Sequence, residues 1–311
     1  MKQLRTVFMG TPDFAVPCLA ELCKITQVIG VVTQPDKPRG RGQHMTPSPV
    51  KAFAAAQDIP VYQPVRIKAE DFIPVLEGLA PDLIVVVAFG QILSQRILDI
   101  PPLGCINVHA SLLPRYRGAA PMQWCLIHGE TKTGVTTMFM DAGLDTGDML
   151  LRDELTISPD MNMTELHDAL MEKGAQLLAR TITALQAGNL TPEKQEDSAS
   201  NYAPMLTKET GKIDWSKSAA EIHDLVRALD SWPGAYCFLD GAKFKIWRTK
   251  ASAVELAAMP GEIVSFTSDG MLVGTGNGLL EILELQAPSK KRMSVKDYLR
   301  GHEILLHACF A

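Results

Sequence analysis

Leu83-Ile84-Val85-Val86-Val87-Ala88 is an uninterrupted apolar run of strand length, with three consecutive valines at its centre. A run without polar alternation is typical of an interior strand of a parallel sheet, because helices cover both faces of such a sheet. Two upstream runs, Thr6–Met9 and Val28–Val32, have the same β-branched texture. We therefore expect these three segments to form the centre of one parallel sheet.

Segments with helical periodicity separate these runs, and the alternation continues downstream. The candidate elements are helices at Phe14–Cys23, Pro49–Gln57, Ala69–Leu79 and Leu93–Leu98, a strand at Gly104–His109, a helix at Ala119–His128, a strand at Gly134–Met140 and a helix at Asn162–Gly188. Connections between parallel strands are right-handed and place helices on both faces of the sheet. The first part of the chain is thus predicted to be an α/β domain with a doubly wound, mostly parallel sheet.

The polar stretch 190–206, which contains Pro192 and Pro204, separates this pattern from a different one. It is interpreted as a linker between domains at 1–189 and 207–311. Beyond it, a candidate helix precedes short strands divided by turn dipeptides such as Asp240-Gly241. These elements are a helix at Ser218–Leu229 and strands at Ala235–Leu239, Lys243–Lys250, Gly261–Ser265, Met271–Gly274 and Leu279–Leu285. Five short strands favour a small β-barrel like the OB-fold.

Composition limits the classes of function. The 311 residues are 46% hydrophobic and 21% charged, and the net charge is −5. A nucleic-acid partner would therefore need a local basic patch. No apolar run approaches the length of about 20 residues that a membrane-spanning helix needs, and the six cysteines contain no Cys-x-x-Cys pair. We expect a cytoplasmic protein without membrane contact and without a zinc or redox site.

Asn107-Val108-His109 is the first candidate site. Residues two apart on a strand share a face, so Asn107 and His109 emerge together, close to the carboxyl end of a strand. Open α/β sheets bind ligands at that edge. An amide can donate to a developing oxyanion and an imidazole can carry a proton, which are the requirements of acyl transfer. The alternative is a structural histidine at a strand end.

Asp141-Ala142-Gly143-Leu144-Asp145-Thr146-Gly147-Asp148 follows another expected strand and forms a tight acidic turn. A carboxylate of this turn could orient His109 and accept a proton. The alternative is that these aspartates only stabilise Asx-turns. The glycines do not follow the Gly-x-Gly-x-x-Gly pattern of dinucleotide-binding proteins.

The segment Thr33–Pro49 is long for a strand-to-helix connection. It contains Lys37, Arg39 and Arg41, with Asp36 as its one acidic residue, and it could bind phosphates as a basic loop. Without such a role it would be a solvated insertion.

A second basic zone lies in the C-terminal part of the chain. Lys243 and Lys245 share one face of an expected strand, while Lys290, Lys291 and Arg292 lie on a loop. Patches of this kind suit contacts to an RNA backbone, although similar runs often belong to ordinary solvated surface.

Taken together, these residues resemble the folate-dependent formyltransferases, and specifically the family that acts on methionyl-tRNA. The matching stretches are Gly10-Thr11-Pro12-Asp13-Phe14-Ala15, the run Gln34–Gly42, the run Cys105–Pro121 and the run Asp141–Met149. The similarity extends over essentially the whole chain. It implies a Rossmann-like formyltransferase catalytic domain at 1–189 and an OB-like tRNA-binding domain at 207–311.

The resemblance also implies functional residues. Asn107, His109 and Asp145 would form the catalytic triad, and Ser111-Leu112-Leu113-Pro114 would bind tetrahydrofolate. Lys37, Arg39, Arg41 and the C-terminal cations would contact tRNA, with Arg41 at the acceptor arm. The implied reaction moves the formyl group of 10-formyltetrahydrofolate to the α-amine of initiator methionyl-tRNA, uses no metal and needs only a monomer.

Three other functions remain compatible with these residues. A formyltransferase acting on another amine, such as a nucleotide-linked amino sugar, would share the triad but would need neither the basic loop nor the C-terminal barrel. A non-catalytic tRNA-binding relative would not need an intact triad. A nicotinamide-dependent dehydrogenase would have the same strand–helix alternation, but the glycine fingerprint is missing.

Overall fold

The computed structural model describes residues 3–39, 44–253 and 256–311. Its contacts divide the chain into two compact units. Unit 1 comprises residues 1–118, 133–155 and 167–202, and unit 2 comprises residues 119–132, 156–166 and 203–311. The segments 119–132 and 156–166 thus group with the C-terminal residues, and the division into 1–189, 190–206 and 207–311 remains a prediction of the sequence.

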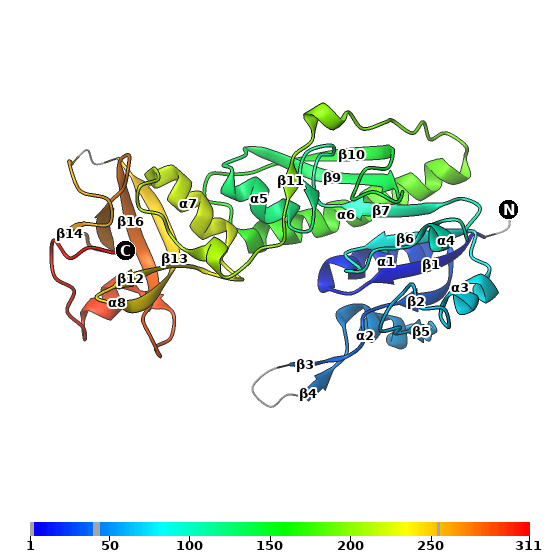
Figure 1. Ribbon diagram of the computed structural model, residues 1–311, viewed down its shortest axis with the longest axis horizontal. Coiled ribbons are helices and arrows are strands. Elements are labelled where there is room, and N and C mark those ends of the chain that lie inside the picture. Colours follow the sequence, from blue (N-terminus) through cyan, green and yellow to red (C-terminus); the bar gives the residue numbers. More distant parts are fainter. Residues whose placement is uncertain (1–2, 40–43, 254–255) are drawn as a thin grey trace. The chain divides into compact units, whose positions relative to one another are not determined.

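Unit 1 is built on a seven-stranded sheet with the order β10-β9-β7-β6-β1-β2-β5. The strands are β1 (Arg5–Gly10), β2 (Gln27–Val32), β5 (Val61–Tyr62), β6 (Leu83–Val87), β7 (Cys105–His109), β9 (Lys132–Phe139) and β10 (Met149–Thr156). The pairs from β5 through β2, β1 and β6 to β7 are parallel, and β9 runs antiparallel to β7. The predicted α/β class and mostly parallel sheet are therefore confirmed (Figure 1).

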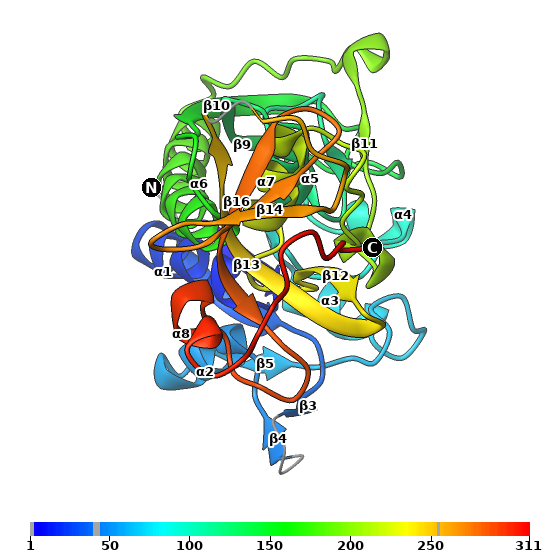
Figure 2. The same cartoon turned by 90° about the vertical axis from the view of Figure 1, so that its left-hand side faces the viewer.

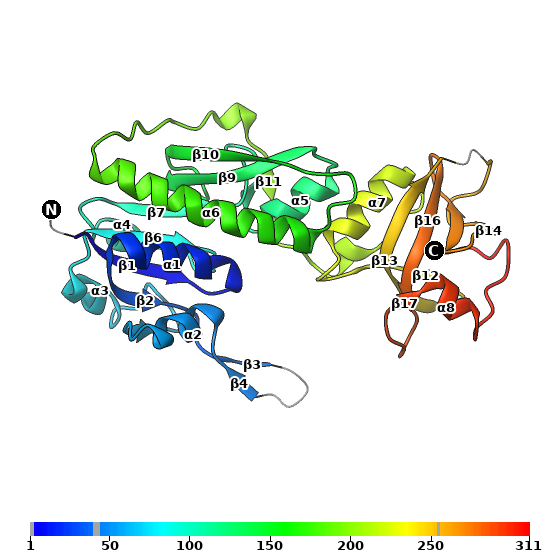
Figure 3. The same ribbon diagram turned by 180° about the vertical axis from the view of Figure 1, so that it is seen from behind.

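Helices cover both faces of this sheet, which explains why every residue of β6 is buried. On one face, Ile84 and Val86 belong to a core that includes residues of α3 and α4. The other face is covered by α6 and α1 (Figure 3). There, Gly174 of α6 lies against Val108 of β7 and near Cys18 of α1. The helices are α1 (Val16–Ile25), α2 (Pro49–Ala56), α3 (Ile73–Leu79), α4 (Gln95–Leu98) and α6 (Met163–Gln186).

Two buried cysteines of unit 1 behave as core residues. Burial raises the pKa of the Cys18 and Cys105 thiols to about 12, so both stay protonated and unreactive at neutral pH. Within the part of the chain that the structure describes, no helix has the length and apolar character needed to cross a bilayer.

Unit 2 contains a six-stranded sheet whose neighbouring strands pair antiparallel, as expected for the C-terminal part (Figure 2). Its strands are β12 (Ala235–Leu239), β13 (Ala242–Ser252), β14 (Ile263–Phe266), β15 (Met271–Gly274), β16 (Leu279–Gln286) and β17 (Met293–Ser294), and its helices are α5 (Pro121–Ile127), α7 (Ala219–Ala228) and α8 (Val295–Leu299). The order β12-β13-β16-β15-β14 leaves β12 and β14 at the two ends of the path.

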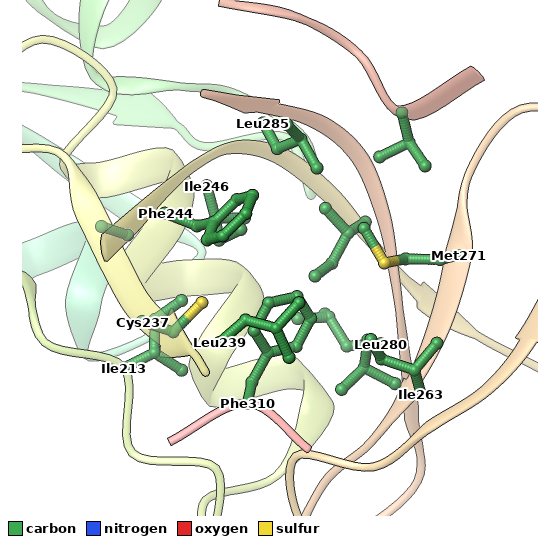
Figure 4. Packing of buried hydrophobic residues seen from close by; sticks show 14 of the residues in the cluster. Ile213, Cys237, Leu239, Phe244, Ile246, Ile263, Met271, Leu280, Leu285 and Phe310 are labelled. Atoms are coloured by element: carbon green, nitrogen blue, oxygen red, sulfur yellow. The ribbon is translucent and has the colours of Figure 1, made fainter. Parts of the chain in front are cut away.

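The core of unit 2 forms between α7 and the inner face of this sheet. Phe244 and Ile246 of β13 alternate with outward-facing residues and pack with Leu285 of β16 and Phe310 (Figure 4). A capping box starts α7: the Ser218 side chain accepts from the Glu221 backbone N–H, and Glu221 reciprocates. The predicted helix and strands of this part thus share one hydrophobic core.

The sequence did not predict several short elements. Inside the basic segment Thr33–Pro49, β3 (Lys37–Arg39) pairs antiparallel with β4 (His44–Thr46), where we expected only a loop. Three-residue strands are too short to show periodicity, so only their mutual pairing reveals them. The remaining short strands are β8 (Arg117–Gly118) and β11 (Tyr202–Ala203).

Truncation of Ile246, which is fully buried, should destabilise unit 2. We expect Ile246→Ala to lower the free energy of unfolding by about 2–5 kcal/mol and Ile246→Val by about 1 kcal/mol, because each leaves a cavity. Lys250→Ala, on the exposed side of β13, should change it by less than about 0.5 kcal/mol. Urea denaturation followed by tryptophan fluorescence measures all three, and equal effects of Lys250→Ala and Ile246→Ala would contradict this packing.

Candidate active site

The carboxyl end of β7 presents the first part of the site. Ile106 and Val108 are buried, while Asn107 between them is only partly buried. His109, the last residue of the strand, is 6% exposed, and its Nε2 lies 2.9 Å from the carbonyl oxygen of Tyr116. The backbone carbonyl of Tyr116, outside the strand, therefore holds the imidazole in place.

The acidic turn supplies the second part, and its aspartates have different roles. Both carboxylate oxygens of Asp141 accept from Thr146, and one also accepts from the Gly143 backbone N–H. Asp141 thus stabilises the turn. Asp145 Oδ2 instead lies 3.7 Å from His109 Nδ1 and accepts a 2.8 Å hydrogen bond from the Gly118 backbone N–H. The structure therefore brings His109 and Asp145 together, from segments 36 residues apart in the sequence.

The partners of His109 determine which ring nitrogen can act. A carbonyl oxygen can only accept, so Nε2 must carry the hydrogen in its contact with Tyr116. In the neutral imidazole, Nδ1 is then a free acceptor that faces Asp145. The 3.7 Å separation is longer than a hydrogen bond but within reach of an ion pair. This arrangement can hold one proton between an imidazole nitrogen and a carboxylate.

The segment Ser111–Pro114 follows directly. Ser111 Oγ donates to Arg115 O at 2.6 Å, and the Leu113 backbone N–H donates to Thr136 Oγ1 at 3.2 Å. Ser111 and Leu113 are buried, whereas Leu112 and Pro114 are partly exposed. Only Leu112 and Pro114 of this segment therefore present side-chain surface to a ligand beside β7, and the other two anchor the turn.

The order of the strands adds a feature that the sequence could not provide. β2 and β6 flank β1 on opposite sides, so the chain leaves β1 toward one side of the sheet and later returns on the other. Open α/β sheets bind ligands at such a switch point, at the carboxyl edge of the strands. At that edge, Thr11 Oγ1 donates to Phe89 O at 3.1 Å, and Gln34 Nε2 donates to the same carbonyl at 3.2 Å. Ile92 nearby in the sequence is 77% exposed. The segment after β6 is thus a further candidate for contact with a ligand bound at this edge, and sequence reasoning missed it.

Tyr116 and Gly118 were also missed as individual contributors. Their backbone groups contact His109 and Asp145, and both have positive φ angles of +59° and +117°. The sequence did contain one indication of this role, which is Gly118 within the Arg115–Ala119 stretch. A left-handed backbone that approaches a side chain closely favours glycine.

The basic residues of unit 1 lie on the hairpin. Lys37 begins β3 and is exposed, and Arg39 ends the same strand. Arg41 lies outside the described residues.

In unit 2, three of the predicted cations gather around aromatic rings on the outer face of the sheet. Lys245 Nζ lies 5.2 Å and the Arg292 guanidinium 5.3 Å from the centre of the Trp247 ring. Lys243 Nζ lies 3.3 Å from the centre of the Tyr236 ring. Cations interleaved with aromatic rings are a composition that suits nucleic-acid surfaces. Lys290 and Lys291 are exposed on the loop between β16 and β17.

Comparison with known families gives two matches that together span most of the chain. A family described as formyl transferase matches residues 4–182, and one described as formyl transferase, C-terminal domain, matches residues 205–303. Methionyl-tRNA formyltransferase of Geobacter sulfurreducens is 52% identical over 305 residues, which are 98% of this chain and 96% of that protein. The enzyme of the same name from Clostridioides difficile is 50% identical and covers 97% of this chain and 98% of its own.

Solved structures share the fold at low identity. WlaRD, a sugar 3N-formyl transferase, superposes with a TM-score of 0.69 at 19% identity over 94% of this chain and 100% of its own. HypX from Aquifex aeolicus, crystallised with tetrahydrofolic acid, gives a TM-score of 0.63 at 16% identity over 96% of this chain and 47% of its own.

Gly147 in the acidic turn provides a test of this geometry. A Cβ at Gly147 would lie 1.9 Å from the Phe139 carbonyl oxygen, so Gly147→Ala must displace the turn and should lower the free energy of unfolding by about 1–3 kcal/mol. The matched control is Gly78→Ala in α3, where a Cβ meets nothing within 4 Å. We expect the control to be neutral or stabilising by up to about 1 kcal/mol. Thermal unfolding measures both, and a Gly147→Ala melt equal to wild type would mean that the turn is looser than described.

Proposed function

The chain belongs to the formyl transferase family, and from that premise we propose that it transfers the formyl group of 10-formyltetrahydrofolate to the α-amine of methionyl-tRNA. The observation that carries the proposal is the His109–Asp145 pair at the end of β7, the strand that also carries Asn107. Relatives named methionyl-tRNA formyltransferase, half identical over nearly the full length, support the choice of acceptor.

The first chemical requirement is a proton acceptor, because an α-ammonium group cannot attack a formyl carbon. Nδ1 of His109 and the carboxylate of Asp145 face each other at 3.7 Å and can take this proton between them. Once protonated on both nitrogens, the imidazole is a cation whose charge the carboxylate balances. The pair can then give this proton to N10 of the departing folate, and the second proton that the attacking nitrogen loses as it becomes an amide is released to solvent.

The second requirement is stabilisation of the negative charge that develops on the formyl oxygen. The side chain of Asn107, partly buried and two residues before His109 on β7, can donate a hydrogen bond to that oxygen. A neutral amide suits this role because it donates without titrating.

For the folate, the chain offers the exposed parts of the turn after β7. Leu112 and Pro114 supply apolar surface to an aromatic ring system, while Ser111 and Leu113 keep the turn rigid through Arg115 O and Thr136. Polar contacts to the ring would come from backbone groups of this segment.

For the tRNA, we assign phosphate contacts to Lys37, Arg39 and Arg41 in unit 1. In unit 2 we assign them to the exposed residues Lys290 and Lys291 and to the cations Lys243, Lys245 and Arg292 around Tyr236 and Trp247. Local patches must perform this task because the net charge of the chain is −5. A single chain has all these groups, which fits a cytoplasmic monomer.

The acceptor can be tested directly by measuring transfer of radiolabelled formyl groups. The assay compares initiator methionyl-tRNA, elongator methionyl-tRNA and a nucleotide-linked amino sugar, with the full-length chain and 10-formyltetrahydrofolate. We expect transfer to the initiator substrate with the largest kcat/KM. Preferred transfer to the amino sugar would replace this proposal by the other formyltransferase function, and RNA binding without any turnover would favour a non-catalytic relative.

Truncation of Asn107 or His109 should remove most of the turnover. We expect Asn107→Ala and His109→Ala to keep the wild-type melting temperature within a few degrees and to lower kcat by on the order of 10²–10³-fold, the usual effect of losing one oxyanion donor or proton carrier. Single-turnover kinetics with saturating substrates separates this effect from binding. Near-normal turnover in either variant would refute the assignment of that residue.

Arg41→Ala should weaken tRNA recognition and leave the chemistry intact. We expect a higher KM for methionyl-tRNA, an unchanged KM for the folate, and a weaker dependence of KM on salt, because each lost phosphate contact reduces the release of counterions. Steady-state kinetics from 50 to 200 mM KCl measures this dependence. Lys24→Ala, on the exposed side of α1, is the control. If both variants behave alike, the basic segment has no part in binding.

A further inference from the structure

The polar segment 190–206 makes a specific contact with the candidate site. Residues 191–199 are exposed with one exception, Gln195, which is partly buried. Its side-chain amide Nε2 donates to two backbone carbonyl oxygens of the acidic turn, Asp145 O at 2.8 Å and Gly147 O at 2.7 Å. One side chain from this segment thus binds the backbone of the residue that faces His109.

The other end of the Gln195 amide is also fixed. Its Oε1 accepts a 2.9 Å hydrogen bond from Arg117 Nε, and Arg117 Nη1 forms a 2.9 Å ion pair with Asp197. The Arg117 side chain is only 11% exposed. Because Oε1 accepts from a guanidinium, the orientation of the amide is unambiguous: its NH₂ group must face the turn.

Asn201 makes a similar contact with the other turn of the site, the one that follows β7 and contains Tyr116. Its Oδ1 accepts from the Tyr116 backbone N–H at 2.6 Å, and its backbone carbonyl accepts from the Arg117 N–H at 3.1 Å. Tyr116 is the residue whose carbonyl binds His109 Nε2. The segment 195–201 therefore holds both backbone turns that position the His109–Asp145 pair.

The backbone conformation of Asp145 sets the position of its carboxylate. Its φ angle of +54° is left-handed, a region that aspartate adopts more readily than most residues other than glycine and asparagine. The Asp145 carboxylate itself accepts a hydrogen bond from the Gly118 N–H. Without Gln195, relaxation of this residue toward an extended backbone would move the carboxylate away from Nδ1.

We propose that Gln195 is a positioning residue for formyl transfer, which acts by donating to the carbonyls of Asp145 and Gly147 and so holds the Asp145 carboxylate opposite His109. This inference rests on the proposed function, in which Asp145 shares a proton with His109. Misplacement of a reacting group by about 1 Å can lower a rate by about 100-fold, so a loss of this size from a residue remote from the substrate is physically reasonable.

Gln195→Glu separates the proposed role from simple packing. Glutamate has the same shape and binds Arg117 more strongly, but its carboxylate can only accept, and it would repel the two carbonyl oxygens. We expect kcat to fall by about 10–100-fold while the KM values for both substrates stay within about twofold. Gln195→Ala should show the same split. The matched control is Glu193→Gln, an exchange between the same two side-chain types on the same segment. The Glu193 carboxylate pairs with Arg152 at 2.8 Å, and its backbone bonds with Met149, which follows the turn. The kcat of this control should equal wild type.

A double-mutant cycle with Asp145→Asn distinguishes failure of this inference from failure of the proposed function. If Gln195 acts through Asp145, Gln195→Glu should lower kcat much less in the Asp145→Asn background than in wild type. Full additivity, or a Gln195→Glu variant with normal kcat beside an impaired Asp145→Asn, would overturn the positioning role alone. A normal Asp145→Asn variant would instead overturn the role of Asp145 in the proposed function. Thermal melts of all variants identify any that fail to fold.

Discussion

The approach of Asp145 to His109 is the constraint on which the candidate chemistry depends. Neither residue is unusual by itself, since one ends a strand and the other lies in a tight turn. Their separation of 3.7 Å creates a site that can accept, hold and return a proton. The orientation of the His109 ring is set by a backbone carbonyl: Tyr116 O accepts from Nε2, so that Nδ1 faces the Asp145 carboxylate.

This constraint explains much of the surrounding architecture. Because β9 runs antiparallel to β7, with Phe139 opposite Ile106, the acidic turn leaves the sheet beside the start of β7. The turn must therefore fold back along the strand for Asp145 to reach His109 at the other end. Gly147 allows the turn to approach Phe139 O closely, and the positive φ angles at Tyr116, Gly118 and Asp145 direct backbone groups at the two side chains. A left-handed backbone at an aromatic residue such as Tyr116 persists only where surrounding contacts determine it, and the bond from its N–H to Asn201 is such a contact. Gln195 fixes the carbonyl of Asp145 in the same way.

In unit 2, strand alternation determines which side chains reach the surface. Its inner sheet face and α7 bury one compact apolar core, which frees the outer face of β12 and β13 for polar and aromatic side chains. Burying Phe244 and Ile246 on one side of β13 necessarily turns Lys243, Lys245 and Trp247 to the other. Strand alternation thus gathers cations and rings on one surface without any change in the net charge of the chain.

The sequence by itself determined the parallel core, because runs such as Leu83–Val87 are apolar on both faces, and the strand-end location of Asn107 and His109, because residues two apart share a face. It also determined the Asp141–Asp148 turn, but it assigned Asp145 only through resemblance to a family. Only the tertiary structure decided that Asp145 faces His109 while Asp141 bonds within its own turn, that β3 and β4 pair, and that Gln195 reaches across 50 residues to the turn. These contacts join segments far apart in the chain, and local periodicity contains no information about which distant backbone groups a side chain will meet.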